Sequence, residues 1–399
     1  MSDIYFDHSA TTPLDSKVLD AMLPYLQDCF GNPSSRYRLG REARQGMEKA
    51  RRNIAELIGA EPGEIVFTSG GTEANNMSIL GTAYGGGKKG RHIITSSVEH
   101  RAVLEPCRYL EGNGFEISFL PVDDNGMVDP EQVLQAIRSD TILISIMHGN
   151  NEIGTIQPVE EIGLIAKEKG IPFHCDAVQS VGRISVDVNR INCDLLSISA
   201  HKFYGPKGVG CVYHRKDAKL LPLIRGGGQE NGLRGGTQNL PAIAGMGKAA
   251  ELAGDSLNST QKEVSVLRDR IIEGISDEIP EAVLNGHRFK RLPGNVSFSF
   301  NNLDGAPLVA MMDEKGIAAS NGSACHSDIP SPSHVLKAMG YSDKLAQSTV
   351  RLTVGRGNNN GEVDYLLAVF PDIIDSLRDV PPRQADVECS CQNRPSPLM

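Results

Sequence analysis

The 399-residue sequence has no tryptophan, few aromatic residues and no long apolar run. No run approaches the roughly 20 apolar residues that a membrane-spanning helix needs, so we expect no membrane segment. The opening residues 1–9 carry acidic groups and lack a basic start and an apolar core, so we expect no secretory signal peptide. A net charge of −9 argues against a broad nucleic-acid surface, and we recognise no nucleic-acid motif.

Paired cysteine spacing is also absent. The eight cysteines follow neither the pattern of a secreted disulfide framework nor that of a zinc ribbon, and scattered thiols fit a reducing compartment. We therefore predict a cytoplasmic protein without a structural metal. Their positions are Cys29, Cys107, Cys175, Cys193, Cys211, Cys325, Cys389 and Cys391.

The order of patterned segments predicts an α/β protein of two domains. Helical and extended segments alternate from Ser16 to about residue 215, which is typical of a mostly parallel sheet covered by helices on both faces. After the glycine-rich residues 226–237, a long helical stretch to about Ser276 leads into a second, α+β region. We predict a large domain over 15–262, a small domain from 1–14 and 263–378, and a flexible polar tail over 379–399.

Short apolar runs of strand type mark the large domain. Functional residues of such sheets cluster at the carboxyl ends of the strands, so the polar side chains that follow these runs should meet in one crevice. An amphipathic helix over 43–58, ended by Gly59, precedes the first run. The runs cover residues 64–68, 92–96, 141–147, 172–175, 194–199 and 208–213.

Lys202 follows the run 194–199 and precedes a glycine-rich turn. Desolvation there would favour a neutral amine, which can form a Schiff base with a carbonyl compound such as pyridoxal phosphate. Taken alone, a solvated surface lysine is the commoner explanation.

Three further segments suggest a phosphorylated aromatic cofactor. The two glycines before Thr72 would let helix amides face a phosphate, although Thr72 could equally be an N-cap. Asp176, just past a strand, could keep a pyridine nitrogen protonated, or it could cap a helix. His100 could stack on an aromatic ring and exchange protons, or it could be a hydrogen-bonded core histidine.

Two residues of the C-terminal third suggest substrate chemistry. Cys325 stands in a polar, proline-containing segment, where a thiolate could be reached by water and substrate. Arg351 lies between apolar neighbours, and a half-buried guanidinium is suited to the carboxylate of an amino acid.

Taken together, these motifs resemble the cysteine desulfurases of the NifS/IscS type. The resemblance runs in order from about residue 4 to about residue 370. It implies a fold-type I, class V pyridoxal-phosphate enzyme with a seven-stranded sheet, usually a homodimer. Tyr37 stands where many relatives carry histidine, and we assign it no role. The motifs are Asp7–Pro13, Gly31–Ser35, Thr68–Asn76, Val98–His100, Asn150–Gly154, Asp176–Gln179, Ser199–Lys202 and Gly322–Cys325.

The resemblance also implies a role for each matching residue. Lys202 would be the Schiff-base lysine, Asp176 the partner of the pyridine nitrogen and Cys325 the cysteine that forms a persulfide. His100 would stack on the cofactor ring, and Gln179 would hold its phenolic oxygen. The phosphate would be bound by Gly71, Thr72, Ser199 and His201, with Thr237 reaching across the dimer, and the substrate carboxylate by Asn151 and Arg351.

The implied reaction converts L-cysteine to L-alanine and leaves the sulfur on Cys325. The length of the segment from Cys325 to Val335 favours desulfurases that pass sulfur to an acceptor protein, such as an iron–sulfur scaffold; acceptors for tRNA or DNA thiolation stay open. A selenocysteine lyase, a class V aminotransferase and a non-catalytic sulfur-handling scaffold are the competing hypotheses. Cys389 and Cys391 fall outside the resemblance and could belong to an inert tail, a relay thiol pair or half of a metal site.

Overall fold

The computed structural model describes residues 3–85, 90–301, 303–321 and 332–378. A seven-stranded sheet in the order β2-β8-β7-β6-β5-β3-β4 forms the centre of its larger part. β8 is antiparallel to both of its neighbours, and the other pairs of this sheet are parallel. The strands are β2 (Ile65–Thr68), β3 (His92–Ser96), β4 (Glu116–Leu120), β5 (Thr141–Met147), β6 (Phe173–Asp176), β7 (Leu195–Ser199) and β8 (Gly210–His214).

The predicted fold class is confirmed, and each predicted run lies on a strand of this sheet. The runs did not include β4, an edge strand whose side chains are mostly half-buried or exposed. β4 needs no continuous apolar run because most of its side chains reach solvent, unlike those of β2 at the other edge. The sequence therefore gives a weaker signal for β4 than for the central strands.

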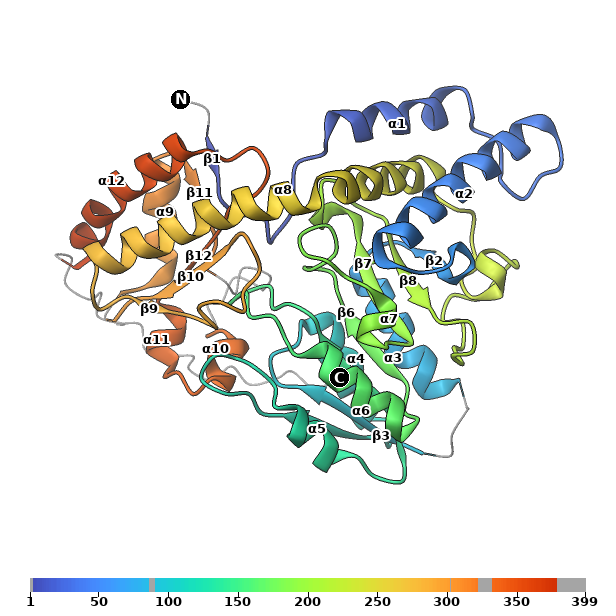
Figure 1. Cartoon of the computed structure of the whole chain (residues 1–399), viewed down its shortest axis with the longest axis horizontal. Helices are drawn as coiled ribbons and strands as arrows, with labels where there is room; N and C mark the ends of the chain where they lie inside the picture. The colour runs from blue at the N-terminus through green and yellow to red at the C-terminus, as the bar shows by residue number, and fades with distance from the viewer. Residues whose placement is uncertain (1–2, 86–89, 302, 322–331, 379–399) are drawn as a thin grey trace, which may run out of the picture.

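Helices pack around this sheet (Figure 1). The predicted amphipathic helix is α2, which buries Ala43, Met47 and Ile54 and ends at Gly59 in the left-handed region, with φ 68°. The helices of this part are α1 (Ser16–Gln27), α2 (Arg38–Ile58), α3 (Gly71–Tyr84), α4 (Arg101–Glu111), α5 (Pro130–Ala136), α6 (Val159–Lys169) and α7 (Val188–Ile191).

The helix α8 (Leu240–Glu278) connects this part to the smaller one, and Figure 1 shows it crossing the molecule from α1 and α2 toward α9 and α12. Its first half, from Leu240 to Ala250, joins the core of the larger part, whereas Val264 to Ile275 join a second core. The domain boundary predicted at residue 262 thus falls inside a continuous helix.

The smaller part holds an antiparallel sheet in the order β12-β10-β9, beside a parallel pair of β1 and β11. Phe6, next to β1, is buried in the second core, so the N-terminus belongs structurally with the C-terminal third. The elements are β1 (Ile4–Tyr5), β9 (Val283–Leu284), β10 (Asn295–Ser299), β11 (Ile317–Ala318), β12 (Thr349–Thr353), α9 (Gly305–Glu314), α10 (His334–Ala338), α11 (Asp343–Gln347) and α12 (Asn360–Arg378).

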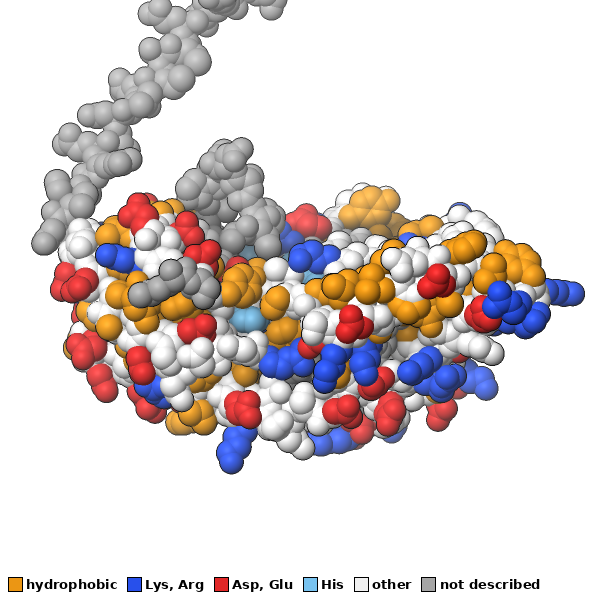
Figure 2. Space-filling view, turned by 90° about the horizontal axis from the view of Figure 1, so that it is seen from above, with side chains coloured by type: hydrophobic (Ala, Val, Ile, Leu, Met, Phe, Trp, Pro, Cys, Tyr) orange, Lys and Arg blue, Asp and Glu red, His pale blue; other side chains and the backbone are white. Residues whose placement is uncertain are grey.

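The surface that carries α1 is partly apolar. Figure 2 shows hydrophobic side chains gathered over the end of the molecule that carries α1, whereas acidic side chains gather at the opposite end. Leu19, Leu23 and Leu26 of α1 and the nearby Phe30 are all exposed. Within the described residues, no helix is long and apolar enough to cross a membrane.

Candidate functional site

A cavity of about 310 Å³ lies at the carboxyl ends of the parallel strands, where the sequence predicted a crevice. Its volume is within the usual range for a small-molecule site. Because β2, β3, β5, β6 and β7 run in one direction, the residues that follow them converge on this edge. The predicted site residues that line it are Gly71, Thr72, His100, Asn151, Asp176, Gln179, Ser199, His201, Lys202 and Arg351.

Lys202 reaches the cavity from a single 3-10 turn, Ala200–Lys202, directly after β7. Its Nζ donates hydrogen bonds to the backbone carbonyls of Ser9 and Ala10, each at 2.7 Å. The amine is thus held by neutral acceptors of the N-terminal segment. Lys202 is half-buried, so the commoner explanation of a fully solvated surface lysine does not apply.

Asp176 is the last residue of β6 and is buried. Its Oδ2 accepts a hydrogen bond from Nδ2 of Asn75 at 2.7 Å, and its Oδ1 accepts one from the backbone N–H of Val178 at 3.0 Å. The carboxylate therefore accepts two hydrogen bonds and faces the cavity. Among the described residues, no basic side chain forms an ion pair with it. Sequence reasoning missed Asn75, although it stands in the motif Thr68–Asn76.

The first turn of α3 faces the same cavity. Gly70 has φ 154° and ψ −176°, a backbone conformation open almost only to glycine. A Cβ atom on Gly71 would lie 2.8 Å from Cγ2 of Val178, so residue 71, like residue 70, must be glycine. Gly70 is the N-cap of α3, and the alternative that Thr72 caps the helix is wrong because Thr72 already lies inside it.

Two histidines have defined ring states. His100 is the N-cap of α4, and its Nδ1 accepts the N–H of Ala102 at 3.0 Å, so a neutral His100 carries its proton on Nε2. Burial, helped by the charge of Lys202, lowers the pKa of His201 to about 4. His201 is therefore neutral at pH 7, with Nδ1 3.1 Å from Oγ1 of Thr11.

Gln179 and Arg351 both have buried polar atoms that face this region. Nε2 of Gln179 donates to the carbonyl of Ser9 at 3.0 Å, while its Oε1 has no partner among the described residues. Arg351, on β12, donates to the carbonyl of Asn151 at 3.1 Å and to Oδ1 of Asp7 at 2.8 Å. Its Nε is likewise buried without a described partner.

The segment Asp7–Thr12 is the main feature that sequence reasoning left without roles. Its side chains and carbonyls contact Lys202, Gln179, His201 and Arg351, which come from both parts of the chain. The sequence marked this segment as the motif Asp7–Pro13 of the resemblance, which assigned no role to its residues. Its importance became visible once tertiary structure placed it across the cavity.

Comparison with known proteins agrees with this geometry. The aminotransferase class-V family model matches residues 4–366. The cysteine desulfurase IscS of Methanosarcina thermophila is 51% identical over 379 residues, which are 95% of this chain and 94% of that protein. The IscS of Dictyoglomus turgidum is 52% identical over 380 residues, covering 95% and 96%.

The chain belongs to the cysteine desulfurases of the aminotransferase class-V family. A solved NifS-like protein matches this desulfurase with a TM-score of 0.88 and 40% identity, over 94% of this chain and 100% of that one. A structure described as SspA in complex with cysteine matches with a TM-score of 0.79 and 40% identity, over 88% and 99%.

One predicted residue of this desulfurase, Thr237, is not brought to the cavity. It is exposed on the loop that precedes α8 and does not line the cavity in the single chain. Its predicted reach across a dimer stays a prediction. Cys325 lies outside the described residues. The loop predicted to continue to Val335 ends earlier, because Ser333 caps α10, which begins at His334.

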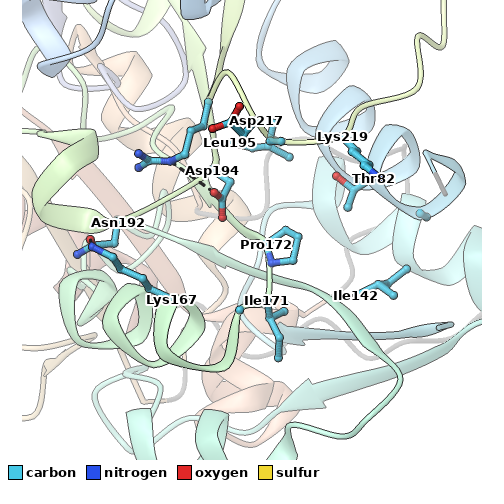
Figure 3. A pocket seen from close by; sticks show the side chains of 14 residues that line it. Thr82, Ile142, Lys167, Ile171, Pro172, Asn192, Asp194, Leu195, Asp217 and Lys219 are labelled. Carbon is cyan, nitrogen blue, oxygen red and sulfur yellow. Dashed lines mark hydrogen bonds and ion pairs between the residues drawn. The ribbon is translucent and has the colours of Figure 1, made fainter. Parts of the chain in front are cut away.

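A larger cavity, of about 510 Å³, lies near the opposite edge of the same sheet (Figure 3). Its charged side chains are largely bonded to near neighbours: Nε of Arg215 lies 3.4 Å from Oδ1 of Asp194, and Nζ of Lys167 donates to Asn192 at 3.0 Å. None of the predicted site residues lines it. Its larger volume alone therefore does not make this cavity the candidate functional site.

Proposed function

We propose that this chain is a pyridoxal 5'-phosphate-dependent cysteine desulfurase that releases L-alanine and passes the sulfur to an acceptor through Cys325. The observation that carries the proposal is the convergence of a lysine amine, a buried carboxylate and the first turn of α3 on one cavity. These are the groups that a phosphorylated pyridine aldehyde requires. The high identity to IscS proteins over nearly the whole chain supports the same activity.

The residues present fit this cofactor. The unpartnered Oε1 of Gln179 offers a polar contact, and the tightly enclosed Gly71 leaves the amides of α3 open to an anion. Asp176 would bind the pyridine nitrogen, and Thr72 and Ser199 would bind the phosphate with His201. Thr237 would complete the phosphate site from a second subunit. When bound, the cofactor supplies an electron sink for the substrate carbon.

The chain's own residues would then carry out the acid–base work. Lys202 would release the carbonyls of Ser9 and Ala10, bind the cofactor aldehyde covalently and later move the Cα proton of the substrate. His100, with its proton on Nε2, would donate that proton at the substrate and take it back later. Asp176 would keep the ring nitrogen protonated because its negative charge favours the protonated form.

Arg351 and Asn151 would hold the substrate carboxylate. Both line the cavity, and Arg351 has a buried Nε without a described partner. Cys325 would attack the substrate sulfur as a thiolate, so that the Cβ–Sγ bond breaks and the sulfur stays on Cys325 as a persulfide. The other product is L-alanine.

A homodimer and a sulfur-acceptor protein are the proposed partners. The exposed apolar face of α1, with Leu19, Leu23 and Leu26, supports a subunit interface on that side. An iron–sulfur scaffold is one such acceptor, and acceptors for tRNA or DNA thiolation stay open. The scattered thiols of the sequence support a cytoplasmic location.

Two variants separate cofactor binding from sulfur transfer. Lys202→Ala should abolish the visible absorbance of the lysine-bound cofactor and the adduct on residue 202 after borohydride reduction. Cys325→Ser should keep both signals and lose persulfide and sulfide formation from L-cysteine. Full turnover of Cys325→Ser would show that another group is the nucleophile, and formation of a keto acid instead of alanine would favour an aminotransferase.

A further inference from the structure

Asp7 pairs with Arg351 of the cavity wall without lining the cavity itself, and the proposed reaction leaves it without a role. Its Oδ1 lies 2.8 Å from an Nη atom of Arg351, and the two side chains are 18% and 5% exposed. A contact this close in a poorly hydrated place is a strong electrostatic interaction. The guanidinium that would hold the substrate carboxylate is therefore already paired with a carboxylate of the chain.

We propose that Asp7 is a positioning residue that limits the affinity of Arg351 for the substrate carboxylate. This inference rests on the proposed function, because it requires Arg351 to be the carboxylate anchor. A guanidinium has five N–H donors. The described contacts use one to Asp7 and one to the carbonyl of Asn151. Donors therefore remain for a substrate, but any carboxylate that binds them must share the cation with Asp7.

The backbone fixes Asp7 in this position. Residue 7 forms a bridge with Thr353 of β12, two residues after Arg351. The backbone N–H of His8 donates to the carbonyl of Thr353 at 3.3 Å, and that of Ser9 donates to its Oγ1 at 2.9 Å. The backbone of Asp7 therefore cannot move away when substrate enters without breaking this bridge.

Other charges near Arg351 do not replace Asp7. Glu152 is buried and attracts Arg351 electrostatically, whereas the half-buried Arg183 repels it. Glu152 forms no ion pair with Arg351 among the described contacts. Asp7 is thus the anion in direct contact with the guanidinium.

The size of the effect follows from the geometry. Two carboxylates on one guanidinium lie roughly 5–6 Å apart, and at an effective dielectric constant of about 20 to 40 their repulsion weakens binding by about tenfold to about 300-fold. An anchor weakened in this way would still orient the substrate and would release the carboxylate of alanine after each turnover.

The test is a titration of the cofactor-loaded enzyme with L-alanine, followed by absorbance and by calorimetry. Asp7→Asn keeps the oxygen that accepts from Arg351 and removes the charge, so its Kd for L-alanine should fall about tenfold and its KM for L-cysteine should fall in parallel. Asp7→Glu keeps the charge, and its Kd should stay within about twofold of the wild type. Tighter binding cannot result from structural damage.

The chain offers a matched control. Asp15 also pairs with an arginine, Arg356, at 2.7 Å, and neither residue lines the cavity. Asp15→Asn should leave the Kd for L-alanine unchanged. An unchanged or higher Kd in Asp7→Asn, or a lower Kd in Asp7→Glu, would overturn the inference.

A third variant separates this inference from the proposed function. Arg351→Lys should weaken L-alanine binding by at least about tenfold, because a point charge replaces a fork of donors. If Arg351→Lys binds weakly and Asp7→Asn does not bind more tightly, only the role of Asp7 is wrong. If Arg351→Lys binds normally, the carboxylate anchor in the proposed function is wrong, and the role of Asp7 with it.

Discussion

The buried ion pair between Arg51 and Glu230 offers a quantitative test of how the loop before α8 is held. Oε2 and Oε1 of Glu230 accept from the two Nη atoms of Arg51 at 3.0 and 3.2 Å. Oε2 also accepts the N–H of Phe67 at 3.0 Å, and Oε1 accepts from Gln238 at 3.1 Å. Only 1% of the Glu230 side chain is exposed, so no water can replace these contacts.

Glu230→Gln keeps the shape of the side chain and removes its charge, which leaves Arg51 with only the more exposed Glu48, whose Oε1 lies 3.3 Å from its Nε. Breaking a buried pair in this way costs about 3–5 kcal/mol. The pair also holds Glu230 at φ 47° and Asn231 at φ 55°, a strained region for both residues. We therefore expect Glu230→Gln to lower the free energy of unfolding in urea by about 3–5 kcal/mol.

The control is the exposed pair Arg38–Glu42, whose side chains are 71% and 35% exposed at a separation of 2.6 Å. Glu42→Gln should cost less than about 0.5 kcal/mol, because a solvated pair of this kind contributes little. Both variants are measured by circular dichroism in urea at equal protein and cofactor concentrations. Equal, small losses in the two variants would refute the idea that the Arg51–Glu230 pair holds this loop.

Three further predictions concern the site and its surroundings. Gly71→Ala places a Cβ 2.8 Å from Val178 and should weaken cofactor binding at least about tenfold in a dialysis assay, whereas Gly63→Ala, which meets nothing within 4 Å, should not. Burial raises the pKa of Glu99 from 4.5 to about 8. Between these pH values the carboxyl of Glu99 therefore keeps its proton in the folded state and loses it in the unfolded chain. The wild type should therefore lose stability relative to Glu99→Gln as the pH rises from 5 to 8 in urea titrations, and a pH-independent difference would contradict the assignment. Thr237→Ala should leave the melting temperature of the apoprotein unchanged and weaken cofactor binding severalfold, and equal cofactor affinity would rule out its role at the phosphate.

Much of the large sheet and of the cavity could be predicted from the sequence because their signals are local. Buried parallel strands appear as continuous apolar runs, and the direction of the chain places whatever follows them at one edge. Lys202, Asp176 and Thr72 were accessible in this way, since each stands within a few residues of a strand end. The resemblance to cysteine desulfurases added roles that no local pattern carries.

Local signals failed where a contact joins distant parts of the chain. Asp7 meets Arg351 across 344 positions of sequence, and Asn75 meets Asp176 across 101. The side chain of Ser333 caps α10, which begins at His334, one residue before the expected end of the loop.

The sequence by itself determined the order of elements, the sheet class and the residue types available to the site, because periodicity and turn chemistry act over a few residues. Tertiary structure alone decided which charges are paired. It laid Asp7–Thr12 across the cavity, gave Arg351 its counter-ion and placed Lys202 against two carbonyls, since these contacts depend on the packing of the two parts against each other.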